Sequence, residues 1–278
     1  MAPAGPREEL VIDPGRGVAI LVTGLSMNRI QSLPAIVPAP SVHGPNAVNV
    51  GAAQYSPPRQ DAHFAFFAPL HYEPNYAYPL FVWLHGPADS ESQLKRIMPL
   101  VSMRNYVGVA VRGTRRVNRP GNAVYSWSQS HADLTLAEQR VLDSIDLARL
   151  RFNIAPRRVF AAGFDCGGTM AFRLAMNHPR RFAGALSLGG AFPSGHGALA
   201  QLDQARRVAL FVACGRESLT YPTVTVCDNL RLFHSAGMNV SLRQYPCGQE
   251  IAPQMLSDMD RWIMEQISLE APGPAKPH

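Results

Sequence analysis

The residues of this sequence that could do chemistry centre on Asp165, within the segment Gly163 to Gly168 (GFDCGG). The apolar run Val159 to Ala162 precedes this segment and a short helix-periodic run follows it, which predicts a buried strand, a sharp turn and a helix. In such a turn, small residues let strand and helix approach closely while a strained backbone holds the central side chain out. A carboxylate held there can attack an alkyl carbon to form an ester. A base must then activate the water that hydrolyses this ester and frees the carboxylate.

The thiol of Cys166 is a second candidate nucleophile. It stands where the predicted helix begins, and a helix N-terminus lowers the pKa of a thiol. Cys214 and Cys247 also follow predicted strands and could approach it as a redox partner, although a buried cysteine more often packs as a small apolar residue. The four cysteines, which include Cys227, have no metal-type spacing. The sequence therefore predicts no metal and no cofactor.

The elements that must position these residues alternate along the chain. Apolar runs predict strands at 62–68, 80–84, 107–111, 159–162, 183–188, 208–213 and 240–245. Helical periodicity predicts helices at 92–104, 134–152, 224–236 and 253–268, with Tyr125 and Trp127 in a loop. Strands separated by helices imply an α/β fold with a mostly parallel sheet, helices on both faces, and function at the carboxyl ends of the strands.

The domain organisation follows from where this alternation begins and ends. We predict one α/β core over residues 62–268. Residues 1–61 mix short apolar runs with proline and glycine and are predicted to form an extension to that core. The proline-rich tail, residues 269–278, is predicted to be disordered.

Composition excludes several classes of function. The chain is 46% hydrophobic and 17% charged. Its formal net charge of +6 is carried almost wholly by arginine, and the arginine doublets are scattered along the sequence. No nucleic-acid motif accompanies them, so we expect a dispersed basic surface and no nucleic-acid partner. The longest apolar run near the start, Gly17 to Leu25, is too short to span a bilayer and lacks a basic leader. These features favour a cytoplasmic protein with reduced thiols.

Four landmarks together carry a family resemblance. They are Leu84 to Ser90 (LHGPADS), Gly163 to Gly168 (GFDCGG), His178 to Gly184 (HPRRFAG) and Gly248 to Ile251 (GQEI). In this order and separation they resemble the landmarks of α/β-hydrolases, and most closely the phospholipase/carboxylesterase and acyl-protein thioesterase branch. The turn at Asp165 then corresponds to the nucleophile elbow of that fold.

The resemblance implies a place for each member of a Ser-Asp-His triad. Asp165 stands in the nucleophile position, and Ser218 stands where the family's G-x-x-D pattern puts its aspartate. Gln249 stands in the position of the histidine. On this alignment all three catalytic residues are replaced, and glutamine cannot accept a proton near neutral pH.

The resemblance also implies an oxyanion loop at His85-Gly86-Pro87. The family takes a backbone amide from the residue after His-Gly, but Pro87 has no N–H, which leaves the amide of Cys166 as the remaining donor. Tyr125 and Trp127 resemble pocket-wall residues, although packing against the sheet would explain them equally well.

Two functions remain open at this point. One is a binding protein without hydrolytic activity, with a small-molecule ligand in the remaining pocket or a protein partner. The other is an active ester or thioester hydrolase that uses Asp165 or Cys166 as nucleophile, or a displaced histidine such as His43. The remaining histidines have structural explanations, since His85 is expected to order the His-Gly turn.

Overall fold

The computed structural model describes two short strands near the start and most of the chain from Phe64 onward, as residues 10–12, 19–20, 64–119, 122–193, 195 and 200–270. His43, most of the predicted 1–61 extension and residues 271–278 of the predicted tail lie outside the described residues.

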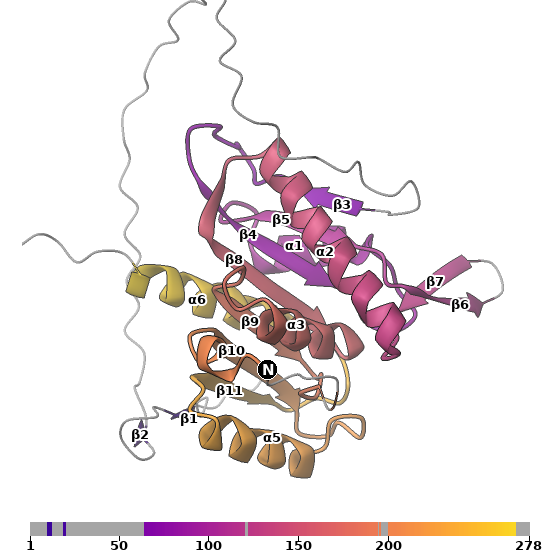
Figure 1. Ribbon diagram of the computed structural model, residues 1–278, viewed down its shortest axis with the longest axis vertical. Helices are drawn as coiled ribbons and strands as arrows, with labels where there is room; N and C mark the ends of the chain where they lie inside the picture. The colour runs from indigo at the N-terminus through magenta and orange to yellow at the C-terminus, as the bar shows by residue number, and fades with distance from the viewer. Residues whose placement is uncertain are drawn as a thin grey trace, which may run out of the picture.

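A single twisted sheet of nine strands runs through the described part of the chain, in the order β2-β1-β11-β10-β9-β8-β4-β5-β3 (Figure 1). The strands are β1 (Leu10–Ile12), β2 (Ala19–Ile20), β3 (Phe64–Phe67), β4 (Tyr78–Leu84), β5 (Val107–Val111), β8 (Ile154–Phe164), β9 (Gly184–Leu188), β10 (Ala209–Gly215) and β11 (Val240–Tyr245). The six strands from β11 to β5 are parallel, and β3 pairs antiparallel with β5. The predicted α/β fold with a mostly parallel sheet is confirmed.

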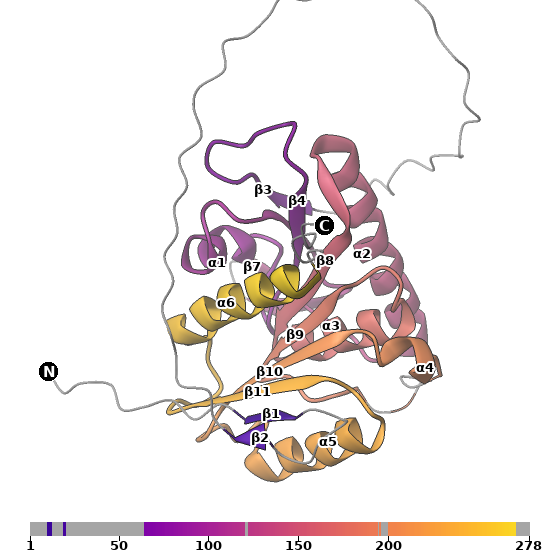
Figure 2. The same ribbon diagram turned by 90° about the vertical axis from the view of Figure 1, so that its left-hand side faces the viewer.

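Helices cover both faces of this sheet. They are α1 (Gln93–Val101), α2 (His131–Arg151), α3 (Cys166–Asn177), α4 (Leu202–Ala205), α5 (Thr223–Ser235) and α6 (Pro253–Glu270). Figure 2 shows α1 and α6 on one side of the sheet and α2 and α3 on the other. Among the described residues, no helix has the length and apolar character needed to cross a membrane.

The central strand β4 explains why two layers of helices are needed. All seven of its residues are buried. Leu80, Val82 and Leu84 pack in the core beneath α2 and α3, whereas Phe81 and Trp83 pack in the core beneath α1 and α6. Because successive side chains of a strand point to opposite faces, an uninterrupted apolar run has to be covered on both of them.

Most predicted elements differ from the structure by a few residues at their ends, and two differences have a clear cause. The helix predicted at 92–104 ends at Val101, because the Ser102 hydroxyl accepts hydrogen bonds from the amides of Arg104 and Asn105 and turns the chain. The loop predicted around Tyr125 is partly a hairpin of β6 (Arg115–Arg119) and β7 (Asn122–Ser126), and Tyr125 lies in β7. Its backbone exchanges two hydrogen bonds with Asp89, which attaches β7 to the loop that follows β4.

The two short strands β1 and β2 extend the sheet beyond β11. β1 pairs antiparallel with β11, and β2 pairs antiparallel with β1. These five residues of the predicted extension therefore belong to the main sheet.

Candidate functional site

Asp165 occupies the predicted turn between strand and helix. It follows β8 and precedes α3, with φ 51° and ψ −120°. This left-handed conformation is unfavourable for a residue with a Cβ. Two backbone hydrogen bonds hold it in place, from the Asp165 amide to the Leu188 carbonyl oxygen (2.8 Å) and from the Thr169 amide to the Asp165 carbonyl oxygen (3.0 Å). The elbow geometry inferred from the sequence is thus present.

Both carboxylate oxygens of Asp165 accept hydrogen bonds from the protein itself. The Cys166 amide donates to Oδ1 at 2.6 Å, and the Gln249 side-chain amide donates to Oδ2 at 2.6 Å. The first bond caps the N-terminus of α3, where the helix dipole favours a negative charge. The Cys166 amide, expected from the sequence to remain as an oxyanion donor, is therefore engaged by the neighbouring carboxylate.

Gln249 links Asp165 to Ser218. Besides its bond to Asp165, its Nε2 donates to the Gly189 carbonyl oxygen at 2.7 Å, while its Oε1 accepts from the Ser218 hydroxyl at 2.6 Å. The opposite amide orientation would point Oε1 at two acceptors, so the network fixes this one. The side chain of Gln249 consequently has every group engaged.

Ser218 completes the chain of hydrogen bonds from the loop after β10. Its side-chain oxygen accepts from the Tyr221 amide at 3.0 Å, and the residue is 3% exposed. The three residues placed by resemblance in the triad positions therefore lie together at the carboxyl ends of three strands. A carboxyl group, that of Asp165, stands at the elbow, and the Ser218 hydroxyl stands where the resemblance places the family's acid.

Gly189 provides the space that Gln249 fills. Its φ is 62°, and a Cβ built there would lie 2.9 Å from both Nε2 and Oε1 of Gln249. Only glycine combines this backbone conformation with such a close approach. Its role was missed in the sequence analysis, where nothing distinguished it from its neighbour Gly190.

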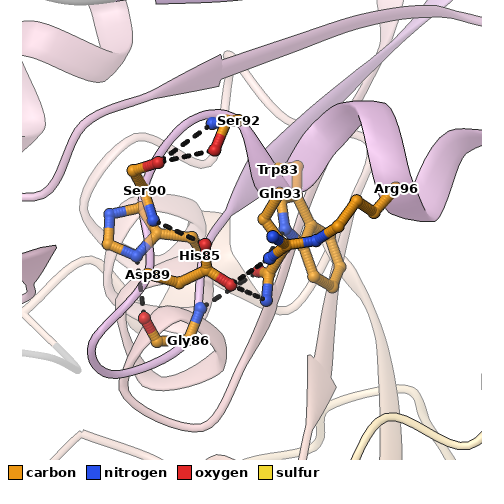
Figure 3. Close-up of polar contacts among 8 residues, drawn as sticks. All are labelled: Trp83, His85, Gly86, Asp89, Ser90, Ser92, Gln93 and Arg96. Carbon is orange, nitrogen blue, oxygen red and sulfur yellow. Dashed lines mark hydrogen bonds and ion pairs between the residues drawn. The ribbon is translucent and has the colours of Figure 1, made fainter. Parts of the chain in front are cut away.

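The turn after β4 is ordered by His85, as expected. The buried imidazole accepts the Gly113 amide at Nε2 (2.9 Å), so its Nδ1 carries the proton and donates to the Gly86 carbonyl oxygen at 2.7 Å (Figure 3). Burial lowers the pKa of His85, which favours this neutral form. Both ring nitrogens are therefore engaged in holding the loop.

The backbone amide of Gly86 also donates to a side chain, that of Gln93 (Figure 3). The Gln93 Oε1 accepts from that amide at 3.2 Å and from the indole of Trp83 at 2.8 Å. Asp89 orients Gln93 by accepting from its Nε2 at 2.9 Å and also pairs with Arg96. The Gly86 amide is therefore engaged and Pro87 has no N–H, so neither residue has a backbone donor free for a ligand.

The two predicted pocket-wall aromatics have different environments. Trp127 is 4% exposed, packs in the core and donates its indole N–H to the His85 carbonyl oxygen at 2.9 Å. Tyr125 is half-buried, and the guanidinium of Arg112 lies 4.6 Å from the centre of its ring. Trp127 therefore supports the loop that follows β4 from within the core.

Cys166 lacks the environment of a reactive thiol. Its sulfur lies 3.5 Å from the Ser126 hydroxyl, and burial raises its pKa above the ordinary value. The prediction that the helix N-terminus lowers the pKa of the Cys166 thiol was wrong, because desolvation by burial has the larger and opposite effect. Burial likewise raises the pKa of Cys214 to about 11. All four cysteines are free thiols.

No histidine among the described residues bonds to Asp165 or Cys166. His178 pairs with Glu138 at 3.3 Å, and His234 lies in the last turn of α5. The described residues also contain no cluster of three or more His, Cys, Asp or Glu side chains that could hold a metal ion.

Comparison with known proteins settles the family. The sequence model of the phospholipase/carboxylesterase family matches residues 125–267, about half of the chain. The chain belongs to this family. The matched region contains Asp165, Ser218 and Gln249, and the family resemblance inferred from the four landmarks is confirmed.

Individual relatives agree with this assignment at the level of fold. A carboxylesterase from Bacillus cereus superposes with a TM-score of 0.60 at 17% identity, over 74% of this chain and 95% of that one. SOBER1 from Arabidopsis thaliana superposes with a TM-score of 0.57 at 18% identity, over 69% and 100%. The protein NocK of Nocardia uniformis subsp. tsuyamanensis is 33% identical over 123 residues, which are 42% of this chain and 34% of NocK. This match spans about a third of that relative's length.

The change Gln249→Glu tests how tightly the three residues are coupled. It is nearly isosteric but points a carboxylate at Asp165 Oδ2 and at the Gly189 carbonyl oxygen, where an N–H donates in the wild type. We expect it to lower the free energy of unfolding at pH 7 by about 1–3 kcal/mol, because two acceptors then face each other in a half-buried site. Protonation removes the repulsion, so the loss should shrink as the pH falls below 5.

Gln139→Glu is the matched control for this measurement. Gln139 also donates its side-chain amide to a carboxylate, that of Asp143 at 2.7 Å, but on the exposed face of α2. Its replacement should cost no more than about 0.5 kcal/mol. Equal losses for the two variants in urea unfolding would show that the Asp165–Gln249 contact is not a buried, specific one.

Proposed function

We propose that this protein is a non-hydrolysing member of the phospholipase/carboxylesterase family that acts by binding a small ligand or a partner. The observation that carries the proposal is the closed set of hydrogen bonds among Asp165, Gln249 and Ser218. Each step of ester hydrolysis by this fold needs a group that these residues do not supply.

The first missing step is proton removal. A serine hydrolase needs a base that takes the nucleophile's proton and later returns it to the leaving group. Gln249 is neutral, and its oxygen already accepts from Ser218. A carboxylate such as that of Asp165 needs no base to attack an alkyl carbon and expel the leaving group. The ester formed on it would nevertheless persist without a base to activate water.

The second missing step is stabilisation of the oxyanion. Of the three backbone groups at the expected position, Pro87 has no N–H, the Gly86 amide donates to Gln93 and the Cys166 amide donates to Asp165. Loss of one such donor costs about 100- to 1,000-fold in rate. The negative charge of Asp165 would in addition repel a developing oxyanion at this position.

An esterase assay tests the proposal directly. We expect the wild-type protein to hydrolyse short-chain p-nitrophenyl esters and acyl thioesters no faster than a nonspecific protein surface does. The Bacillus cereus carboxylesterase serves as the positive control for assay conditions.

The opposite outcome would identify the other function left open by the sequence. Robust turnover that Asp165→Asn or Cys166→Ala abolishes would show an active hydrolase with that residue as its nucleophile. Turnover that survives both changes would instead point to a displaced histidine or another site.

A further inference from the structure

Three arginine doublets that are scattered in the sequence converge in the fold. Arg157-Arg158 lies in the first half of β8, Arg180-Arg181 precedes β9, and Arg206-Arg207 precedes β10. These strands are parallel neighbours, with β9 between the other two (Figure 1). Their amino-terminal parts meet at one edge of the sheet, which is the edge opposite to Asp165. Three of the doublets that look scattered in the sequence are therefore gathered at this edge.

A cavity of about 530 Å³ lies between these segments. Its lining includes four arginines, Arg157, Arg180, Arg181 and Arg207, together with Gln204 and the buried ring of Phe182. Among the described residues, none of those that line the cavity is acidic. The volume lies within the range of about 300–1,000 Å³ that is usual for small-molecule sites.

One carboxylate, that of Asp146, lies beside the cavity, and it compensates only a small part of the positive charge. Asp146 accepts from Arg181 at 2.7 Å and from Arg149 at 3.5 Å, so one negative charge serves two guanidinium groups. Burial, and then the charge of Arg181, lowers the pKa of Arg149. The Nε of Arg181 is buried and has no hydrogen-bond partner among the described residues.

The other three arginines are exposed and available to a ligand. Arg180 donates from Nε to the Gln204 side-chain oxygen at 3.1 Å, which is a neutral partner. Neither Arg157 nor Arg207 forms an ion pair with an acidic residue in the described part of the chain. Several guanidinium groups without acidic partners repel one another around this cavity, and a bound anion would offset that repulsion.

We propose that this cavity binds a small anion that carries two or more phosphate groups. The planar guanidinium presents paired N–H donors that match phosphate oxygens, and these charge-assisted hydrogen bonds are stronger than neutral ones. Four arginines call for more than one negative charge. The site lies at the far end of β8 from Asp165, so the inference does not depend on the proposed loss of hydrolysis.

Binding of inorganic pyrophosphate, measured by isothermal titration calorimetry, tests the proposal. We expect saturable binding of one ion per chain that weakens as salt is added. Arg157→Ala and Arg207→Ala should each reduce the affinity about tenfold, and the double variant about 100-fold, because each removes a charge-assisted contact. Both residues are exposed, so circular dichroism should show an unchanged fold.

Arg104→Ala is the matched control. Arg104 is also exposed and precedes β5, two strands away from β8 in the sheet. Its replacement removes the same charge but should leave pyrophosphate binding unchanged. An equal loss in this variant would reduce the effect to net charge and overturn the proposal.

Two further ligands distinguish the source of the phosphate groups. Vesicles that contain phosphatidylinositol 4,5-bisphosphate present them as a lipid head group, whereas pyrophosphate presents them as a free ion. Binding of either that is lost in the Arg157→Ala/Arg207→Ala variant supports the proposal and identifies the source. Binding of single-stranded RNA alone, or pyrophosphate binding that the double variant retains, would overturn it.

Discussion

Asp165→Ser alone is expected to leave the protein without measurable ester hydrolysis, whereas adding Ser218→Asp, Gln249→His and Pro87→Leu is expected to create it. Triad residues act as a unit, and loss of the base alone costs nearly as much as loss of all three. With Gln249 still in place, a serine hydroxyl at the elbow would have no group to take its proton.

The geometry already present favours the combined change. Ser218 donates to Gln249 and Gln249 donates to Asp165, so the three side chains have the contacts that an acid, a base and a nucleophile need. Asp165→Ser also removes the carboxylate that accepts the Cys166 amide and so returns that amide as an oxyanion donor. Gly86 remains held by Gln93, so the second donor has to come from Pro87→Leu.

The comparison of threefold and fourfold variants measures the oxyanion contribution separately. The threefold variant, which combines Asp165→Ser, Ser218→Asp and Gln249→His, should show weak turnover of p-nitrophenyl acetate. Adding Pro87→Leu gives the fourfold variant and should raise kcat by about 100-fold through the restored N–H. A fluorophosphonate probe should label the fourfold variant and not the wild type. A fourfold variant that folds, binds the probe poorly and has no activity would show that the pocket itself cannot admit an ester.

Local sequence patterns were sufficient for the elements that carry the site. The apolar run before Gly163 and the periodic run after Gly168 specify strand and helix, and the glycines between them specify a tight turn. The hairpin β6–β7 was not predicted because Arg115–Arg119 is a largely polar segment without an apolar alternation. Its one signal was the turn dipeptide Pro120-Gly121 between the two strands.

The hydrogen bonds of the site could not be predicted in the same way. Spacing and resemblance placed Asp165, Ser218 and Gln249 near one another, but not the direction of the bonds between them. Likewise nothing in the sequence identified Gln93 as the acceptor for Gly86, since that contact depends on one side-chain rotamer. Such details decide which amides remain free for a ligand.

The distribution of charge was also hidden in the sequence. Arginine doublets that are 23 and 26 residues apart look scattered until the strands they accompany are known to be parallel neighbours. Each βαβ unit then returns the chain to the same edge of the sheet, so a repeated position in each unit becomes one surface. This is a general way in which an α/β fold gathers residues that are distant in sequence.

Gly167→Ala is expected to destabilise the protein by about 3 kcal/mol, the largest effect that we predict for a single methyl group. Gly167 lies in the first turn of α3, which packs directly against the end of β4. A Cβ there would overlap the Leu84 carbonyl oxygen and lie 2.6 Å from the His85 carbonyl oxygen. Both obstacles are backbone atoms, so the helix and the strand would have to move apart.

The control for this change is Gly248→Ala, next to Gln249, where a Cβ would meet no atom within 4 Å and φ is not positive. That variant should differ from the wild type by no more than about 0.5 kcal/mol. By differential scanning calorimetry we expect Gly167→Ala to lower Tm by about 5–10 °C. The displaced elbow should also slow ester hydrolysis in the fourfold background, because Gly167 sets the distance between the elbow and the loop that follows β4. A Gly167→Ala variant as stable as Gly248→Ala would mean that the close approach of α3 to β4 is not required to form the elbow.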